Sequence, residues 1–357
     1  MQNKLSVVQV IDMLSAGGAE RVLVTLSNIL HDHGHKVKVI TTVSTGVLSS
    51  QLHAGIELQS LNRKWKWNPV TMYKLIRAVK DFDVIHVHSR HNLRYFLLAK
   101  SLFGLKKKNF YQEHHGYRAN TKATALEKKL FPLTNFIAVS EGLKQWAIKE
   151  AGVNAAKTFV LPNIVLKENN LPVPRRTENI SLVIVSNFVP VKNLEFAIEV
   201  FDKLNKEDKN LRLTIIGATA DKEYYEKIIS LIGEKGIQQF ITIISDCTNV
   251  QHLLPQFDLA IHASKSESGP LVLIEYMAQS LPFITYKTGE VANQLKKDLP
   301  EFIMQNFDDN EWAQHIKVLL QMDKKILQDR LQNVFEKNYS TDSYYEKCLL
   351  IYSKGLP

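Results

Sequence analysis

The amino-acid sequence predicts an α/β protein with two domains, each built on a parallel, doubly wound sheet. Three observations support this prediction. The chain has 357 residues, which is more than one hydrophobic core usually supports. Apolar, β-branched runs alternate with helical periodicity from end to end, as βαβ units do. A polar segment with two prolines, residues 164–179, interrupts the alternation and indicates an interdomain linker.

In the first half, apolar runs predict strands and amphipathic runs between them predict helices. The expected strands are Val7–Ile11, Val37–Thr42, Val84–Val87, Phe136–Val139 and Thr158–Leu161. The expected helices are Ala19–His31, Val70–Lys80 and Glu141–Ala151. Gly34 stands just beyond the first helix, where a glycine commonly ends one.

After the polar segment the alternation restarts. The expected strands are Leu182–Val185, Leu211–Ile216, Ile241–Ile244 and Leu259–His262, with helices at Leu194–Leu204 and Tyr224–Gly233. A last helix at Thr341–Lys354 has a stripe of Tyr344, Tyr345, Cys348, Leu349 and Tyr352, which predicts a packing face. We therefore expect domains at 1–163 and 180–340, with the helix at about 341–357 packing back onto the first domain.

Composition and cysteine usage narrow the class of protein. The content of hydrophobic residues is 45%, as in ordinary folded proteins. Cys247 and Cys348 lie far apart and match no metal or redox spacing, so we expect a reduced, cytoplasmic compartment. No apolar stretch approaches the ~20 residues that a membrane-spanning helix needs. The first apolar run ends at Asp12 without a small-residue cleavage site, which favours a first strand over a signal peptide.

Charge is shared unevenly between the two halves. Residues 1–165 have a formal net charge of +13, and residues 166–357 have −4. The basic clusters Arg63–Trp67 and Lys106–Lys108 lie beside aromatic and apolar residues, as in surfaces that rest on anionic lipids. Scattered, solvated lysines would explain any single cluster as well. Nucleic acid is not the expected partner, because no recognition motif is present.

Two loops of the first half follow strands and contain candidate functional residues. Paired Gly17 and Gly18 open a helix and allow a ligand to approach its free N–H groups, although a simple turn explains them about as well. His115 and Gly116 end a strand that begins at Asn109, where α/β proteins bind ligands. The alternative is that the imidazole only covers the sheet edge. The spacing fits no zinc site, and we expect His86 and His88 to be structural.

Two loops of the second half complete the set. Lys192 lies at the start of a helix and can neutralise a diphosphate. Glu267 and Glu275 flank a Gly-Pro turn that precedes a helix. A helix start binds phosphate, and carboxylates accept hydrogen bonds from sugar hydroxyls. Glu275 lies among apolar residues, where an unpaired carboxylate is costly to bury. This segment therefore predicts a nucleotide-sugar pocket rather than a solvated face.

Taken together, the four loops resemble those of the retaining family-4 glycosyltransferases of the GT-B fold, and the resemblance extends over essentially the whole chain. The matching pieces are Gly17–Arg21, Asp83–His88, His115–Gly116, Ala138–Glu141, Leu161–Asn163, Lys192, Glu267–Glu275 and Tyr276–Ile284. The Glu-x7-Glu segment with the Leu-Pro strand after it is fairly specific, whereas each other piece is weak alone. The resemblance implies two Rossmann-like domains that face each other across a cleft.

The resemblance also assigns roles to individual residues. The implied catalytic residues are His115, Lys192 and Glu267, and the implied donor-binding residues are Gly17, Gly18, Asn187, Lys192, Gly269, Pro270, Leu271 and Glu275. Lys192 would hold the donor diphosphate, Glu275 the ribose and Glu267 the transferred sugar. His115 would approach that sugar from the first domain. Neither a metal nor a cofactor is expected besides the uridine or guanosine diphosphate sugar.

The chain departs from the family pattern at three places. Ser186 and Asn187 stand where the family usually has Gly-Arg, so one of two expected phosphate cations is missing. Ile164 follows Asn163 where Gly is usual, and Ser280 stands where Gly usually precedes the Leu-Pro turn. We expect these changes to affect diphosphate affinity rather than the fold.

The resulting expectation is transfer of a sugar, with retention, to a hydroxyl of a glycan or lipid-linked glycan. The setting would be bacterial surface polysaccharide synthesis (lipopolysaccharide, capsule or exopolysaccharide), in the cytoplasm or at the inner face of the membrane. Two alternatives remain open: a nucleotide-sugar epimerase of the same fold, and a degenerate, non-catalytic glycan-binding subunit. A nicotinamide dehydrogenase is disfavoured, because no Gly-x-Gly-x-x-Gly follows either first strand.

Overall fold

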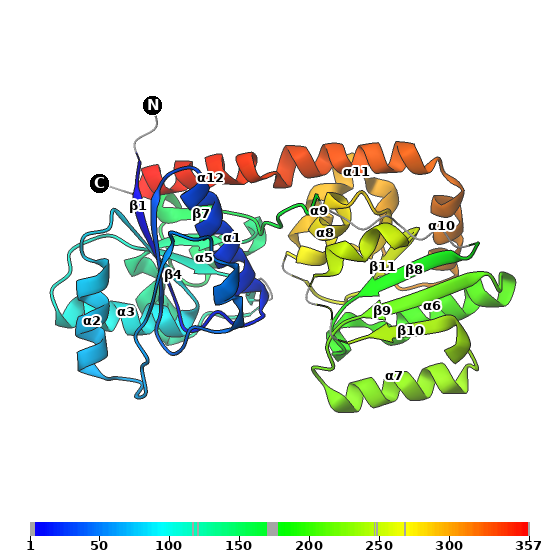
Figure 1. Ribbon diagram of the computed structural model, residues 1–357, viewed down its shortest axis with the longest axis horizontal. Coiled ribbons are helices and arrows are strands. Elements are labelled where there is room, and N and C mark those ends of the chain that lie inside the picture. Colours follow the sequence, from blue (N-terminus) through cyan, green and yellow to red (C-terminus); the bar gives the residue numbers. More distant parts are fainter. Residues whose placement is uncertain are drawn as a thin grey trace. The chain divides into compact units, whose positions relative to one another are not determined.

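The computed structural model describes residues 4–115, 118–119, 121–169, 178–245, 247, 249–267 and 269–355. Gly116 and half of the predicted linker, residues 170–177, lie outside these residues. The chain forms two compact units (Figure 1), of which one comprises Met1–Ile164 with Ser340–Pro357 and the other comprises Val165–Tyr339. Ile164 is buried in the core of the first unit and Val165 in that of the second, so the chain passes between the units at this bond.

The first unit is built on a parallel sheet in the order β3-β2-β1-β4-β5-β6-β7. Its strands are β1 (Ser6–Ile11), β2 (Lys36–Thr41), β3 (Glu57–Ser60), β4 (Val84–His88), β5 (Phe110–Glu113), β6 (Asn135–Ala138) and β7 (Thr158–Val160). Its helices are α1 (Gly18–Asp32), α2 (Pro69–Val79), α3 (Arg90–Leu102), α4 (Ala125–Leu130), α5 (Glu141–Lys149) and α12 (Thr341–Gly355). This is the predicted doubly wound architecture.

Local signals explain where these helices begin and end. The side chain of Asn68 accepts hydrogen bonds from the N–H groups of Val70 and Thr71, and Pro69 occupies the first turn of α2. Gly34 follows α1 with φ of 78°, the left-handed conformation that favours glycine after a helix. The predicted end of the first helix is therefore confirmed.

Side chains of alternating parity cover the two faces of this sheet. Val8 and Val10 of β1 belong to one core with α2, α3 and α5, whereas Val7 and Ile11 belong to the other with α1 and α12. Four residues of the predicted stripe on α12 are buried and Leu349 is partly buried against the same core, and the Tyr352 hydroxyl lies 2.9 Å from Nδ1 of His86. The last helix thus completes the core of the first unit.

The second unit repeats the plan with a parallel sheet in the order β10-β9-β8-β11-β12-β13. Its strands are β8 (Ile180–Val185), β9 (Leu211–Ile216), β10 (Ile241–Ile244), β11 (Leu259–His262), β12 (Phe283–Tyr286) and β13 (Ile303–Met304). Its helices are α6 (Leu194–Glu207), α7 (Lys222–Glu234), α8 (Leu271–Ala278), α9 (Gly289–Asp298), α10 (Asp309–Gln321) and α11 (Lys324–Tyr339).

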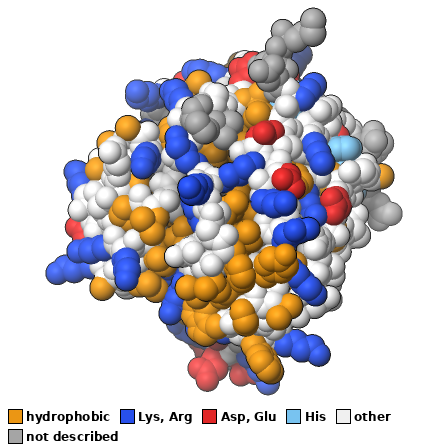
Figure 2. Space-filling model, turned by 90° about the vertical axis from the view of Figure 1, so that its left-hand side faces the viewer, with side chains coloured by type: hydrophobic (Ala, Val, Ile, Leu, Met, Phe, Trp, Pro, Cys, Tyr) orange, Lys and Arg blue, Asp and Glu red, His pale blue; other side chains and the backbone are white. Residues whose placement is uncertain are grey.

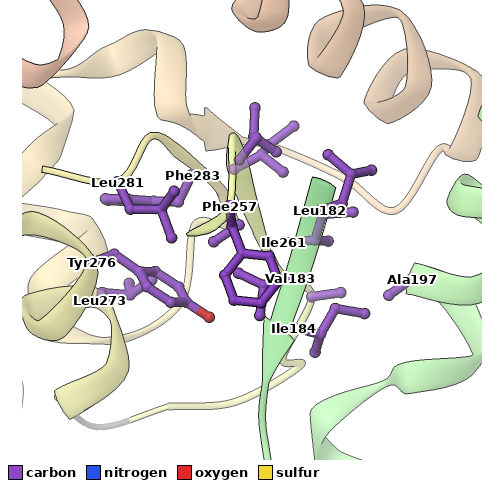
Figure 3. Packing of buried hydrophobic residues seen from close by; sticks show 14 of the residues in the cluster. Leu182, Val183, Ile184, Ala197, Phe257, Ile261, Leu273, Tyr276, Leu281 and Phe283 are labelled. Atoms are coloured by element: carbon purple, nitrogen blue, oxygen red, sulfur yellow. The ribbon is translucent and has the colours of Figure 1, made fainter. Parts of the chain in front are cut away.

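Helix α8 is anchored in the core of this second unit. Figure 3 shows Leu273 and Tyr276 of α8 among side chains of β8, β11 and β12. The Tyr276 hydroxyl accepts a hydrogen bond from the N–H of Val185, the last residue of β8 (3.2 Å). The start of α8 is therefore held at a fixed place relative to the loop that follows β8.

Among the described residues, every helix is too short or too polar to cross a lipid bilayer.

Candidate active site

The sheet of the second unit has a point where its strand order reverses direction. The chain runs outward from β8 to β9 and β10, then returns to form β11 on the other side of β8. Loops that leave the carboxyl ends of two such strands diverge and leave a crevice where α/β proteins bind ligands. Here the loops are also joined, because the N–H of Lys265 donates a hydrogen bond to the carbonyl of Val191 (2.8 Å).

These two loops bring Lys192 and Glu267 together. Lys192 ends a short 3₁₀ helix, Pro190–Lys192, and Asn193 then takes a left-handed conformation (φ 56°, ψ 45°) that turns the chain into α6. The Lys192 Nζ lies 2.5 Å from Glu267 Oε1, and the two side chains are only 24% and 11% exposed. The N–H of Glu267 donates to the hydroxyl of Thr288, beyond β12 (3.2 Å). Two predicted catalytic residues thus form one ion pair.

A third residue joins this pair. His262, the last residue of β11, is buried, and its Nε2 lies 3.2 Å from the same Glu267 oxygen. Burial raises the pKa of the Glu267 carboxyl group, but the contacts with His262 and Lys192 outweigh burial and lower this pKa to about 2. Glu267 is therefore a carboxylate at neutral pH. We call Lys192, Glu267 and His262 the switch-point cluster.

The start of α8 lies directly after this cluster in the chain. Gly269 and Pro270 are buried, and Pro270 is the N-cap with φ of −65° and ψ of 116°. The first N–H groups of a helix, here from Leu271 onward, have no partner within the helix, so they can bind an anion. Glu275 lies one turn further along α8 and is 8% exposed. From Glu267 to Glu275 the chain thus contains a carboxylate, the start of a helix and a second carboxylate, in the order predicted from the sequence.

Asn187 lies in the loop after β8, the loop that also contains Lys192. Its side chain is exposed, and its Oδ1 accepts a hydrogen bond from the N–H of Ala218, after β9 (3.2 Å). Gly217 makes this contact between loops possible, because a Cβ atom there would lie 2.0 Å from the Ser186 carbonyl oxygen. Gly217, directly after the predicted strand Leu211–Ile216, was the sequence signal that could have predicted this contact between loops.

In the first unit, Gly17 and Gly18 follow β1. Gly17 is the N-cap of α1, and a Cβ atom there would lie 2.4 Å from Oε2 of Glu20. The other oxygen of Glu20 accepts a hydrogen bond from the Ser15 hydroxyl (2.9 Å). Because Gly17 has no side chain, the Glu20 carboxylate can fold back over the start of α1.

His115 follows β5 and is oriented by a buried carboxylate. Oε1 of Glu113, whose side chain is 2% exposed, accepts a hydrogen bond from the N–H of His115 (3.0 Å) and lies 2.9 Å from its Nδ1. This hydrogen bond raises the pKa of His115 against the opposing effect of burial. Because the His115 side chain is 59% exposed, it presents an oriented imidazole at the surface. Glu113 is a positioning residue that sequence patterns alone did not identify.

Within the described ranges, no three or more His, Cys, Asp or Glu side chains are grouped as metal ligands. The Asp-Phe-Asp sequence at 81–83 precedes β4, and Asp83 accepts hydrogen bonds from the N–H and hydroxyl of Ser6. It therefore lies at the amino edge of the sheet, opposite the edge where His115 and Gly17 lie.

Comparisons with known proteins agree with this architecture. Residues 16–166 match the Glycosyltransferase Family 4 description, and residues 167–338 match Glycosyl transferases group 1. The chain is 23% identical over 352 residues to the capsular polysaccharide biosynthesis glycosyltransferase CapH of Staphylococcus aureus, covering 96% of this chain and 98% of that protein.

Two solved structures share the fold. HepE of Anabaena, in complex with uridine diphosphate and glucose, superposes with a TM-score of 0.80 at 16% identity, covering 98% of this chain and 99% of that one. The lipopolysaccharide outer core galactosyltransferase WaaB, in its apo form, gives a TM-score of 0.72 at 16% identity, covering 99% and 100%. Because the Glycosyltransferase Family 4 model matches the first half of the sequence and the Glycosyl transferases group 1 model matches the second, the chain belongs to the glycosyltransferases of the GT-B architecture.

Proposed function

We propose that this glycosyltransferase moves a sugar from a nucleotide diphosphate sugar to a hydroxyl of a glycan or lipid-linked glycan, with retention at the anomeric carbon. The switch-point cluster beside the start of α8 is the observation that carries this proposal. The capsular polysaccharide and lipopolysaccharide relatives support bacterial surface polysaccharide synthesis, and the complex of HepE supports a uridine diphosphate donor over a guanosine one.

In this proposal the second unit stabilises the leaving group. Negative charge develops on the departing phosphate as the sugar becomes oxocarbenium-like, and preorganised donors stabilise that charge. Lys192 and the first N–H groups of α8 supply the donors without a metal. Glu275 accepts hydrogen bonds from the ribose, and the Glu267 carboxylate faces the sugar.

The first unit contributes to the sugar and acceptor in this proposal. His115, with its pKa raised by Glu113, offers a protonated or strongly hydrogen-bonding imidazole to the transferred sugar. Gly17 and Gly18 would meet a phosphate or an acceptor group at the start of α1 once the Glu20 carboxylate, which fills the space beside Gly17, has moved aside.

Nucleotide binding tests the first step. Uridine diphosphate, present at 100 times its dissociation constant, is expected to stabilise the protein by about 2.7 kcal/mol. Guanosine and adenosine diphosphates serve as comparisons in a thermal unfolding assay. Turnover is then followed by nuclear magnetic resonance with and without a glycan acceptor. Conversion of the donor to another nucleotide sugar without acceptor would instead identify an epimerase, and absence of nucleotide binding would indicate a non-catalytic subunit.

His262 provides a separate prediction for the switch-point cluster. Replacing His262 with Leu removes the buried 3.2 Å contact to Glu267, and we expect kcat to fall roughly tenfold, which corresponds to about 1.4 kcal/mol of lost transition-state stabilisation. His262→Gln can still offer an N–H, so it should recover most of kcat. Carboxylate nuclear magnetic resonance should show a higher Glu267 pKa in the Leu variant. His252→Gln, on an exposed side chain of the same unit, is the control. Equal kcat in the Leu variant and wild type would rule out this positioning role.

We also propose that the protein works in the cytoplasm, at the inner face of the membrane. A lipid-linked acceptor would be presented there, and the basic first half supports attraction to anionic lipid.

A further inference from the structure

The first unit has an apolar surface that its own core does not use. We call it the α2–α3 surface, and its members are Trp65, Trp67, Val70, Tyr73, Leu98, Leu102 and Phe103. Trp65 is 75% exposed, and Val70 and Leu102 are each 59% exposed. Figure 2, which views this side of the molecule, shows hydrophobic side chains gathered in the lower part of the view with Lys and Arg side chains around them.

Two contacts between the α2 and α3 segments join members of this surface. Helices α2 and α3 pack on the same face of the sheet. Each connects two parallel strands, so both helices run opposite to the strands. At one end, the Arg94 guanidinium lies 4.6 Å from the centre of the Trp67 ring. Near the other, the rings of Tyr73 and Phe103 are 5.5 Å apart. Val70 and Leu98, both exposed, fall between these contacts along their helices.

The charge around this surface is mainly positive. Residues 61–108 contain twelve Lys and Arg residues, and their only acidic residues are Asp81 and Asp83. Asp83 is engaged by the backbone and side chain of Ser6. Lys64, Lys66 and Lys74 are exposed. A rim of cations around exposed aromatic and aliphatic groups is complementary to a bilayer, which offers anionic headgroups above an apolar interior.

We propose that the α2–α3 surface docks onto anionic lipid bilayers, with its lysines on the headgroups and Trp65 and Leu102 entering the boundary with the acyl chains. The aliphatic members favour lipid over nucleic acid, because a phosphodiester backbone would leave their apolar area exposed to water. This surface deepens the proposed function by naming how the enzyme reaches a lipid-linked acceptor, yet it can be tested without turnover.

The four tryptophans of the chain give a direct measurement. Trp65 and Trp67 lie in the α2–α3 surface, whereas Trp146 and Trp312 are buried, at 4% and 0% exposure. Adding vesicles of phosphatidylglycerol and phosphatidylcholine should shift the tryptophan emission to the blue, and lipids brominated near the headgroup should quench it. In the Trp65→Phe/Trp67→Phe variant both effects should disappear while the signal of the buried pair remains.

Variants separate charge from apolar contact. Lys64→Glu/Lys74→Glu should lower co-sedimentation with these vesicles by roughly tenfold or more, since each lysine near an anionic surface contributes separately. Trp65→Ala/Leu102→Ala should lower it at any salt concentration. Lys296→Glu/Lys297→Glu, on exposed residues of α9, is the matched control and should bind as wild type does.

Three outcomes would overturn the docking proposal. They are equal binding by the α2–α3 variants and the control, equal binding to vesicles with and without phosphatidylglycerol, and binding of a duplex oligonucleotide that responds to the same variants while vesicles do not bind. Thermal stabilisation by uridine diphosphate in each variant reports on the donor site separately. If uridine diphosphate does not stabilise the wild-type protein, the proposed function is contradicted, whereas the docking result is unaffected.

Discussion

Lys192→Met is expected to lower glycosyl transfer by about 10²–10³-fold, the effect of removing a preorganised donor from a developing anion. Ser186 and Asn187 stand where the family usually has Gly-Arg, so Lys192 supplies the positive charge of the loop after β8. The substitution also removes the Lys192 partner of the largely buried Glu267 carboxylate, which keeps its contact with His262. We expect nucleotide diphosphate affinity to fall together with kcat, as measured by calorimetry and donor turnover.

Glu267→Gln distinguishes the two partners of this ion pair. It removes the carboxylate that faces the sugar but leaves Lys192 charged, so kcat should fall while diphosphate affinity is kept or increased. Lys317→Met is the matched control, because it breaks a 2.7 Å pair with Glu207 in the same unit between side chains that are 36% and 60% exposed. Full turnover by Lys192→Met with an intact fold would contradict the assigned role of the switch-point cluster.

The second large effect is expected on stability at mildly acidic pH. His86, His88 and His114 form a cluster in the first unit, in which His86 and His88 are buried, His114 is partly buried, and Nδ1 of His88 lies 2.9 Å from Nε2 of His114. Burial lowers the pKa of His86 to about 3 and that of His114 to about 4, and it holds the pKa of His88 well below its ordinary value. All three imidazoles are therefore neutral in the folded protein at pH 5.5.

The sign of the pH dependence follows from this difference. In the unfolded chain a histidine has a pKa of about 6.5 and takes up a proton as the pH falls below that value, whereas the folded chain does not. The free energy of unfolding should therefore decrease on acidification. Each histidine contributes about 1.4 kcal/mol at pH 5.5, or about 4 kcal/mol for three. Above pH 7 the effect vanishes.

Urea unfolding at pH 7.5 and 5.5 measures this difference. His114→Gln should reduce the difference in the free energy of unfolding between the two pH values by about one third, because it removes one of the three histidines that take up a proton on unfolding. His53→Gln is the control, because its imidazole is 46% exposed and pairs with Asp32 at the surface. The same free energy of unfolding for wild type at both pH values would show that the buried histidines are not linked to folding.

Much of the fold could be predicted because the central strands are short, apolar and bounded by turn residues. Leu211–Ile216, Ile241–Ile244 and Leu259–His262 are strands with the predicted bounds. Strand β3, Glu57–Ser60, was not predicted, since it lies at the sheet edge and has a polar, partly exposed sequence. Helix α3 was also missed, because Ser89 precedes it with φ of 64° and gives no side-chain cap.

The candidate site could be predicted only as separate loops. Residue patterns place Lys192 after one strand and Glu267 after another, but 75 positions separate them. Their contact depends on β11 pairing with β8, and no local signal encodes which strands become neighbours. His262 and Gly217 were missed for the same reason, since each acts through a residue distant in the sequence. The catalytic and binding roles stay predictions until they are measured.

The position of α12 has a consequence for biosynthesis. Domains generally fold in the order in which they leave the ribosome. Here part of one sheet face in the half that emerges first stays uncovered until α12 has been made, because Tyr345 and Tyr352 share that face with α1. Nascent chains should therefore expose part of an apolar sheet face throughout translation of the second half.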